Sequence, residues 1–141
     1  MHRYNDKRKI MAHYDVVSPY YRTLWGEHLH HGYWATGAES PAEAQLALTA
    51  YLAEAAQIPT GAAILDVGCG FGGSSIYLAK TYRAMVTGIT ISSVQAAMAH
   101  QAADRANVRA QFLVMDADHI ALRGQFDVVW SIEARWDISA A

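Results

Sequence analysis

Short apolar runs recur along the chain, separated by longer segments of helical character. The runs occupy positions 63–67, 84–89, 110–115 and 126–131, and apolar residues dominate each of them. Short continuous apolar runs are typical of strands that are buried on both faces of a parallel sheet. Strands that alternate with helices predict an α/β fold with right-handed crossovers.

The segments between the runs carry helix signals. Ser40-Pro41-Ala42-Glu43 places a capping serine, a proline at the first helical position and a glutamate three residues after the cap, which predicts a helix over 42–57. Residues 74–82 predict a second helix. A second capping box, Ser92-Ser93-Val94-Gln95, predicts an alanine-rich helix that ends near Ala106.

The amino-terminal segment, residues 1–36, is rich in aromatic residues and histidine. Apolar residues at helical spacing predict a short helix over 11–25, with Pro19 interrupting it or lying in its first turn. The basic run 1–9 is interpreted as a solvated, frayed terminus. Four aromatic residues fit a cover over the sheet and contact with a substrate equally well: Tyr20, Tyr21, Trp25 and Trp34.

A glycine-rich turn follows the first predicted strand. Glycines allow a tight turn and a close approach of ligand to backbone, and the next helix begins with unpaired N–H groups. Gly68, Gly70 and Gly73 satisfy the G-x-G-x-x-G spacing of dinucleotide-binding enzymes, but Ile89-Thr90 stands where those enzymes have an acidic residue. Asp66, two residues before the first glycine, can instead accept hydrogen bonds from the ammonium of an amino-acid ligand, or orient the loop.

The position of the ligand site follows from the predicted sheet. In an open α/β sheet, ligands bind beyond the carboxyl ends of the strands. That rule indicates four segments of this chain as the candidate site: 66–73, 89–92, 116–118 and 131–133.

Four segments resemble, in order, the motifs of class I S-adenosylmethionine-dependent methyltransferases of the small-molecule branch. Residues 64–73 look like motif I, and residues 25–34 resemble the segment that precedes the fold. Residues 88–95 are similar to the second motif of tocopherol-type enzymes and cyclopropane-fatty-acid synthases, and residues 126–134 resemble the fourth-strand motif of the tocopherol group. These motifs fall at the predicted strand ends.

This resemblance implies a Rossmann-like parallel sheet with the strand order 3-2-1-4, flanking helices, and S-adenosylmethionine as the cofactor. Asp66 would face the methionine part of the cofactor, Thr90 and Gln95 its ribose and adenine, and Asp116 the exocyclic amine. The cofactor-binding residues that the resemblance implies are Asp66, Gly68, Cys69, Gly70, Gly72, Thr90, Gln95, Asp116, Ala117 and Ser131. The substrate-side residues that it implies are Tyr14, Tyr21 and Trp34.

For several polar residues, two interpretations are possible. Glu133 would lie near the transferred methyl group, either as a catalytic base or in a structural role. Cys69 is interpreted as a small packing residue rather than a nucleophile. His28, His30 and His31 suggest a metal site, and His28 and His31 could share a helix face. The glycines on both sides and the lack of a nearby cysteine favour a lid or an exposed surface instead, so no metal is expected.

Composition and charge narrow the class of protein. The chain has 141 residues, 52% hydrophobic and 17% charged, which suits about one globular domain. A net charge of −2 gives no electrostatic reason to expect nucleic acid or an anionic membrane as partner. The single cysteine, the lack of a secretory signal and the lack of an apolar run near the roughly 20 residues of a membrane helix favour a cytoplasmic location.

Three parts are expected along the chain. Residues 1–36 form a lid or substrate segment, residues 40–134 the methyltransferase core, and residues 135–141 a tail that does not resemble the family. The family fold has seven strands in the order 3-2-1-4-5-7-6, so we expect an amino-terminal portion that is truncated after the fourth strand. Residues 128–130 would then form an uncovered edge. Such a chain would bind the cofactor weakly by itself and turn over nothing.

The predicted function is methyl transfer to a small acceptor, apolar or aromatic by analogy with the family. Two alternatives stay open: a fragment of an NAD(P)-dependent oxidoreductase, and a non-enzymatic remnant that a partner chain completes. The accepting atom (oxygen, nitrogen or carbon) and the oligomeric state are also open.

Overall fold

The structure is a computed structural model, and it describes residues 4–26, 28 and 30–134. Its elements follow the predicted alternation of strands and helices. They are α1 (Tyr4–Trp25), α2 (Pro41–Ala55), β1 (Ala63–Val67), α3 (Gly73–Tyr82), β2 (Met85–Thr90), α4 (Ser93–Ala106), β3 (Ala110–Val114), the 3-10 helix η1 (Ala117–His119) and β4 (Val128–Trp130). Each strand and helix predicted from the sequence is present, although β4 is half as long as expected.

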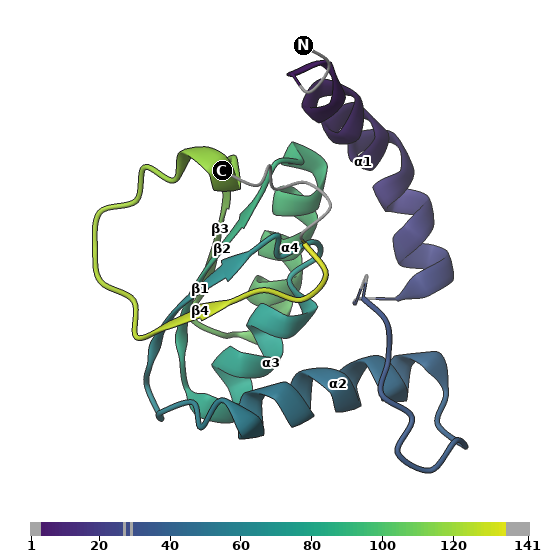
Figure 1. Ribbon diagram of the computed structural model, residues 1–141, viewed down its shortest axis with the longest axis vertical. Helices are drawn as coiled ribbons and strands as arrows, with labels where there is room; N and C mark the ends of the chain where they lie inside the picture. The colour runs from purple at the N-terminus through teal and green to yellow at the C-terminus, as the bar shows by residue number, and fades with distance from the viewer. Residues whose placement is uncertain (1–3, 27, 29, 135–141) are drawn as a thin grey trace.

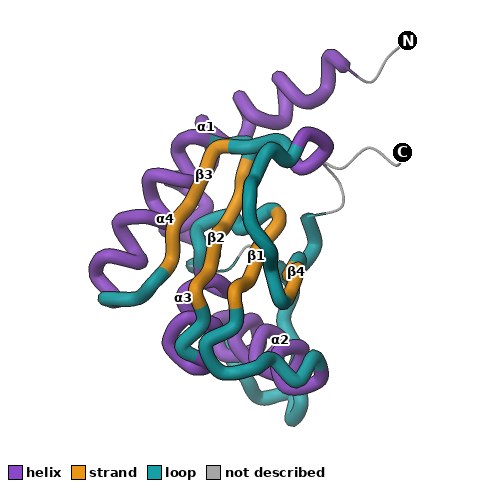
Figure 2. The backbone as a smooth tube through the Cα atoms, turned by 90° about the vertical axis from the view of Figure 1, so that its left-hand side faces the viewer, coloured by secondary structure: helices purple, strands orange, loops and turns teal. Residues whose placement is uncertain are grey.

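The four strands form one parallel sheet in the order β3-β2-β1-β4, as predicted (Figure 2). β1 lies in the centre, where Asp66 is aligned with Gly88 of β2 and with Trp130 of β4. Since aligned residues of neighbouring parallel strands direct their side chains to the same face, Asp66 and Trp130 lie on one face of the sheet.

One face of the sheet packs against helices α2, α3 and α4 (Figure 1). Its core includes Ile64 of β1, Leu78 of α3 and Trp130 of β4, each at most 5% exposed. The expectation that residues 128–130 lack cover is therefore wrong for Trp130, because α2 and α3 cover that face. Val129 points to the opposite face and is 68% exposed.

The opposite face is covered, within the described residues, by the long segment between β3 and β4. Met115, Leu122 and Phe126 from this segment pack against Leu65 and Ile89 of the sheet. Figure 1 shows the segment running down the side of the sheet away from the helices. The carboxyl ends of the strands stay free of both layers, so a site can form there.

Helix α1 is longer than the sequence predicted. It is already helical at Tyr4, and Pro19 lies inside it rather than in its first turn. The interpretation of residues 1–9 as a frayed terminus is wrong for the described part, because Lys7 donates hydrogen bonds to Asp116 and Asp118. A distant ion pair anchors a turn of helix that local sequence gives no reason to expect.

The two predicted capping boxes have different outcomes. At α2, Glu43 N donates to Ser40 Oγ at 3.3 Å and Ser40 N donates to Glu43 Oε2 at 2.8 Å, which confirms the box. At α4 only half of it forms. Gln95 N donates to Ser92 Oγ at 3.1 Å, but the Gln95 side chain accepts from Thr90 Oγ1 at 2.8 Å instead of reaching back to Ser92 N.

No helix in the described part of the chain combines the length and the apolar character that crossing a membrane requires.

Candidate functional site

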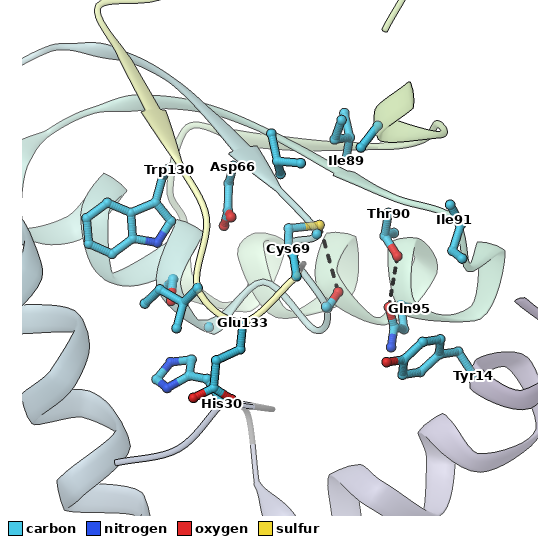
Figure 3. Close-up of a pocket in the computed structure, with 18 of the residues that line it drawn as sticks. Tyr14, His30, Asp66, Cys69, Ile89, Thr90, Ile91, Gln95, Trp130 and Glu133 are labelled. Atoms are coloured by element: carbon cyan, nitrogen blue, oxygen red, sulfur yellow. Dashed lines mark hydrogen bonds between the residues drawn. The ribbon is translucent and has the colours of Figure 1, made fainter. Parts of the chain in front are cut away.

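A pocket of about 430 Å³ lies at the carboxyl ends of the strands. Its lining comes from α1, the three histidines His28, His30 and His31, the glycine turn after β1, and residues at or just after the carboxyl ends of the four strands. Figure 3 shows Trp130, His30 and Glu133 at one end and Thr90, Gln95 and Tyr14 at the other. The site therefore lies where the strand-end rule predicted it.

Most of the residues singled out from the sequence line this pocket. They are Asp66, Gly68, Cys69, Gly70, Thr90, Gln95, Asp116, Ala117, Glu133, Tyr14 and Tyr21. Gly72, Ser131 and Trp34 do not. A Cβ on Gly72 would point at Phe112, Ser131 Oγ donates to Val67 O at 3.1 Å, and Trp34 Nε1 donates to Glu39 O at 3.1 Å.

The glycine turn is built from left-handed backbone conformations. The φ angles of Gly68, Gly70 and Gly72 are 71°, 54° and 81°, a region that favours glycine. The backbone N–H groups of Gly68 and Cys69 both donate to Ile89 O, at 2.9 and 3.0 Å, which fixes the turn to the end of β2. The turn then leads into α3, whose first N–H groups have no side-chain cap. Such a helix start favours an anionic or polar ligand atom.

Asp66 is the buried carboxylate of the site. It is 2% exposed, and its Oδ2 accepts a hydrogen bond from Ser75 Oγ at 2.6 Å. Burial raises the pKa of Asp66 to about 6, although the Ser75 hydrogen bond opposes the shift. Within the described residues no cationic side chain pairs with it. A positively charged ligand group would supply the partner that the protein does not.

Cys69 lines the same turn and is 8% exposed. Burial, followed by the charge of Asp66, raises the pKa of its thiol well above the ordinary value. Because the thiolate is the nucleophilic form, this environment agrees with packing rather than with nucleophilic chemistry.

The opposite end of the pocket is organised around β2 and α4. Thr90 and Gln95 are 5% and 4% exposed, and the hydrogen bond between their side chains fixes both of them. Tyr14 of α1 lies beside Gln95 (Figure 3). Ser92 Oγ donates to Asp15 Oδ1 at 2.5 Å, so α1 is anchored to the start of α4 and closes this end.

Asp116, which follows β3, is held by α1. Both of its carboxylate oxygens accept from Lys7 Nζ, and its Oδ1 also accepts from the backbone N–H of Asp118 at 3.0 Å. Burial alone would raise the pKa of Asp116, but the hydrogen bonds from Lys7 and Asp118 outweigh it and lower the pKa. The lowered pKa keeps the carboxylate ionised at neutral pH, so that both of its oxygens can accept hydrogen bonds.

Three histidines form a hydrogen-bonded group at the Trp130 end. His30, which is 7% exposed, has its Nδ1 2.7 Å from His31 O and its Nε2 3.2 Å from His28 Nδ1. Burial, followed by the charge of His30, lowers the pKa of His28 to about 4. His28, His30 and His31 themselves are not in a helix, so the idea that His28 and His31 share a helix face is wrong. No group of three metal-ligating side chains gathers among the residues that the structure describes.

Glu133 is held by the same amino-terminal segment. Its carboxylate accepts from His31 N at 3.1 Å and from His31 Nδ1 at 2.8 Å. Its φ angle of 56° is left-handed, which a non-glycine residue seldom adopts without such support. The contact joins positions that are 102 residues apart in the chain, and it brings Glu133 to the pocket wall.

Sequence reasoning missed part of the lining. Trp130 was expected on an uncovered edge but is buried, and its Nε1 has no hydrogen-bond partner within the described residues. The alignment of position 130 with Asp66 in the predicted sheet is the signal that could have revealed it. The predicted segments 89–92 and 131–133 contain Ile89, Ile91 and Ile132, which also line the pocket. Four further lining residues lie outside the predicted segments and have no local motif: His13, Ser74, Met115 and Ala134.

Comparison with known proteins identifies the family of the chain. Residues 1–139 match the family described as mycolic acid cyclopropane synthetase. A curated relative from Oryza sativa subsp. japonica, named "Probable tocopherol O-methyltransferase, chloroplastic", is 39% identical over an alignment of 140 residues; the match covers 91% of this chain and 39% of that protein.

Two solved structures share the fold. The [4+2]-cyclase SpnF aligns with a TM-score of 0.83 and 33% identity over 88% of this chain and 48% of its own. The mycolic acid cyclopropane synthase CmaA1, in a complex with SAH and CTAB, aligns with a TM-score of 0.81 and 25% identity over 92% of this chain and 46% of its own. The chain spans less than half the length of each of these three proteins.

Proposed function

Because the chain belongs to the mycolic acid cyclopropane synthetase family, we propose that it carries the cofactor-binding part of an S-adenosylmethionine-dependent methyltransferase that acts on a small molecule. The observation that supports this best is the glycine turn at the end of β1, with the buried Asp66 facing the pocket. The name of the Oryza relative and the ligand in the CmaA1 complex support the same assignment.

The residues present fit an amino-acid cofactor. Asp66 is a buried carboxylate without a cationic partner among the described residues, and an ammonium group is the ligand group that would stabilise its ionised form. The uncapped start of α3 and the glycine backbone suit polar ligand atoms. No acidic residue stands at the end of β2, where a dinucleotide-binding enzyme would have one, and Thr90 occupies that place.

The following roles are proposed for the residues that line the pocket. Asp66, Gly68 and Gly70 bind the methionine part, with the Cys69 backbone between the two glycines. Thr90 and Gln95 bind the ribose and adenine, and Asp116 with Ala117 lies beside the exocyclic amine. Glu133 borders the substrate end, where Tyr14 and Tyr21 help to close the pocket.

The chemistry needs little more than correct placement. When bound, the cofactor supplies a methyl group on a sulfonium, which reacts by in-line displacement. The chain's own residues bind the two ends of the cofactor, keep water out and offer aromatic faces that favour a cation. A base is needed only when the acceptor must lose a proton.

The proposed place of action is the reducing cytoplasm. The one cysteine of the sequence, Cys69, is buried and not in a disulfide, so the fold needs no oxidising compartment.

Calorimetric titration with S-adenosylhomocysteine tests the proposal, with NADH as the comparison ligand. We expect S-adenosylhomocysteine to bind and NADH not to bind. Asp66→Asn should weaken binding about 10- to 100-fold, the effect of losing one hydrogen bond to a charged group. Asp104→Asn, on the exposed side of α4, is the matched control. Tighter binding of NADH, or equal affinities of the two variants, would contradict the proposal.

Binding of S-adenosylhomocysteine does not by itself establish the reaction. The similar fold of a [4+2]-cyclase shows that this architecture does not by itself fix the reaction. Transfer of a labelled methyl group to an acceptor is therefore the second measurement.

A further inference from the structure

One end of the pocket holds two polar atoms for which the described residues provide no hydrogen-bond partner. The first is Trp130 Nε1, in a side chain that is only 5% exposed. Figure 3 shows this indole at the same end of the pocket as His30 and Glu133, away from the Thr90 end. Since an indole N–H only donates, and a buried donor without a partner is costly, the group is suited to an acceptor atom of a ligand.

The second atom is His28 Nε2, and the neighbouring hydrogen bonds determine its protonation. A carbonyl oxygen can only accept, so the hydrogen bond to His31 O places a hydrogen on His30 Nδ1. In a neutral His30 ring the Nε2 is then a lone pair, which lies 3.2 Å from His28 Nδ1 and 3.3 Å from Thr49 Oγ1. Because two lone pairs facing each other at 3.2 Å would repel, the favoured arrangement has a hydrogen on His28 Nδ1. With its hydrogen on Nδ1, a neutral His28 presents a bare Nε2. His28 lines the pocket.

We propose that Trp130 and His28 form the acceptor subsite and that they bind a hydroxyl group, with Trp130 Nε1–H donating to its oxygen and His28 Nε2 accepting its hydrogen. The inference rests on the proposed methyltransferase function and adds the substrate class, an alcohol or a phenol. A hydroxyl both donates and accepts, so it satisfies both atoms. A carboxylate would leave His28 without a donor, and an ammonium would leave Trp130 without an acceptor.

This arrangement gives a balanced transfer step. The hydroxyl oxygen forms a bond to the methyl carbon, the carbon–sulfur bond breaks with its electron pair remaining on sulfur, and the hydroxyl proton passes to His28 Nε2. His28 then releases the proton to solvent. The oxygen becomes strongly acidic as the new bond forms, so a weakly basic imidazole is sufficient to take the proton.

The surroundings keep His28 neutral over the physiological range. Burial and His30 lower its pKa to about 4. The titratable groups that line the pocket include His30 and His31 from the same segment, Glu133 after β4, Asp66 of β1 and His13 of α1. The Glu133 carboxylate is bound to His31, and the Asp66 carboxylate to Ser75. Neither carboxylate is hydrogen-bonded to His28 among the described contacts.

NMR of the ¹⁵N-labelled chain tests the proposal, with phenol as the probe in the presence of saturating S-adenosylhomocysteine. Before phenol is added, long-range imidazole spectra at pH 7 should show the hydrogen of His28 on Nδ1. Phenol should then move the indole N–H signal of Trp130 downfield and shift His28 Nε2. Anisole, which has the same ring and no hydroxyl hydrogen, should leave His28 Nε2 unchanged.

Two variants complete the test. Trp130→Phe and His28→Gln should each weaken phenol binding about 10-fold while the affinity for S-adenosylhomocysteine stays within about twofold, as expected for loss of one hydrogen bond. If S-adenosylhomocysteine alone moves the Trp130 signal, and Trp130→Phe weakens its binding, the indole serves the cofactor and the proposal is overturned. A hydrogen on His28 Nε2 would also overturn it. If S-adenosylhomocysteine does not bind at all, the proposed function fails instead.

Discussion

The Nζ atom of Lys7 lies 2.9 and 2.8 Å from the two carboxylate oxygens of Asp116, a residue 109 positions later in the chain. The same ammonium also contacts Asp118. These contacts tie the first turns of α1 to the segment that follows β3. Helix α1 therefore forms a wall of the pocket rather than a free amino-terminal arm.

Charge reversal at Lys7 should loosen this wall. Lys7→Glu places a third acid beside Asp116 and Asp118, so hydrogen exchange in the first turns of α1 should become faster. The side chains of Lys7 and Asp116 are 29% and 32% exposed, so the loss of global stability should stay near 1 kcal/mol or less. Lys9→Glu on the exposed side of α1 is the matched control. Equal exchange rates in the two variants would show that the ion pair does not hold the helix.

The pH dependence of stability should contain two opposite contributions. The pKa of Asp66 is raised in the fold from 3.8 to about 6, so the folded state binds the proton more readily, and stability falls as pH rises through that window. The pKa of His28 is lowered from 6.5 to about 4, so its contribution to stability rises as pH increases from 4 to 6.5. Each contribution amounts to up to about 3 kcal/mol, and the two nearly cancel.

Urea unfolding between pH 4 and 7 separates the two contributions. Relative to the unmodified chain, Asp66→Asn should become progressively more stable as pH rises, because the cost of ionising a buried carboxylate is gone. His28→Gln should become progressively less stable over the same range. A stability difference that does not change with pH in either variant would refute the corresponding assignment. Between pH 4 and 7, Asp66→Asn should thus gain up to about 3 kcal/mol of stability relative to the unmodified chain, even as it loses affinity for S-adenosylhomocysteine.

The order of the sheet and the place of the pocket could be predicted because both depend on local patterns. Short apolar runs fix the strands, and the turn at Gly68 and Gly70 follows the central strand in sequence. The carboxyl ends of parallel strands meet at one edge, so the predicted segments come together there.

Contacts between distant segments could not be predicted in this way. No local pattern indicates that His31 binds Glu133 or that Lys7 binds Asp116. The second capping box shows the same limit on a smaller scale. Its sequence is correct, but the side chain of Gln95 makes its hydrogen bond with Thr90 of the neighbouring strand. Tertiary partners thus decided the length of α1 and the substrate end of the pocket.

The anchor between α1 and α4 can be measured with a double-mutant cycle. Asp15 Oδ1 accepts from Ser92 Oγ, which also caps α4 by accepting from Gln95 N. Ser92→Ala should cost about 1 kcal/mol through loss of the cap and more through loss of Asp15. The coupling energy of Asp15→Ala with Ser92→Ala should be about 1 kcal/mol or more. Ser93→Ala, at the adjacent exposed serine, should show no coupling with Asp15→Ala.

The glycine turn allows a test in which backbone strain is held constant. Gly61 and Gly72 have φ angles of 80° and 81°, so alanine is equally strained at either position. A Cβ on Gly61 meets nothing within 4 Å, whereas a Cβ on Gly72 would lie 2.8 Å from Phe112 and 3.0 Å from Ala99. Gly61→Ala should therefore cost about 1 kcal/mol, and Gly72→Ala about 1–3 kcal/mol more.

The difference between these two variants measures how closely the turn packs on β3 and α4. Unfolding free energies in urea give that difference directly. Replacing Phe112 with Leu in the Gly72→Ala background should recover part of the loss, because it removes the ring atoms that the new Cβ would meet. Equal costs for Gly61→Ala and Gly72→Ala would mean that only the backbone conformation matters. The turn would then be free to move away from Phe112, and the position of Asp66 over the pocket would not depend on that packing.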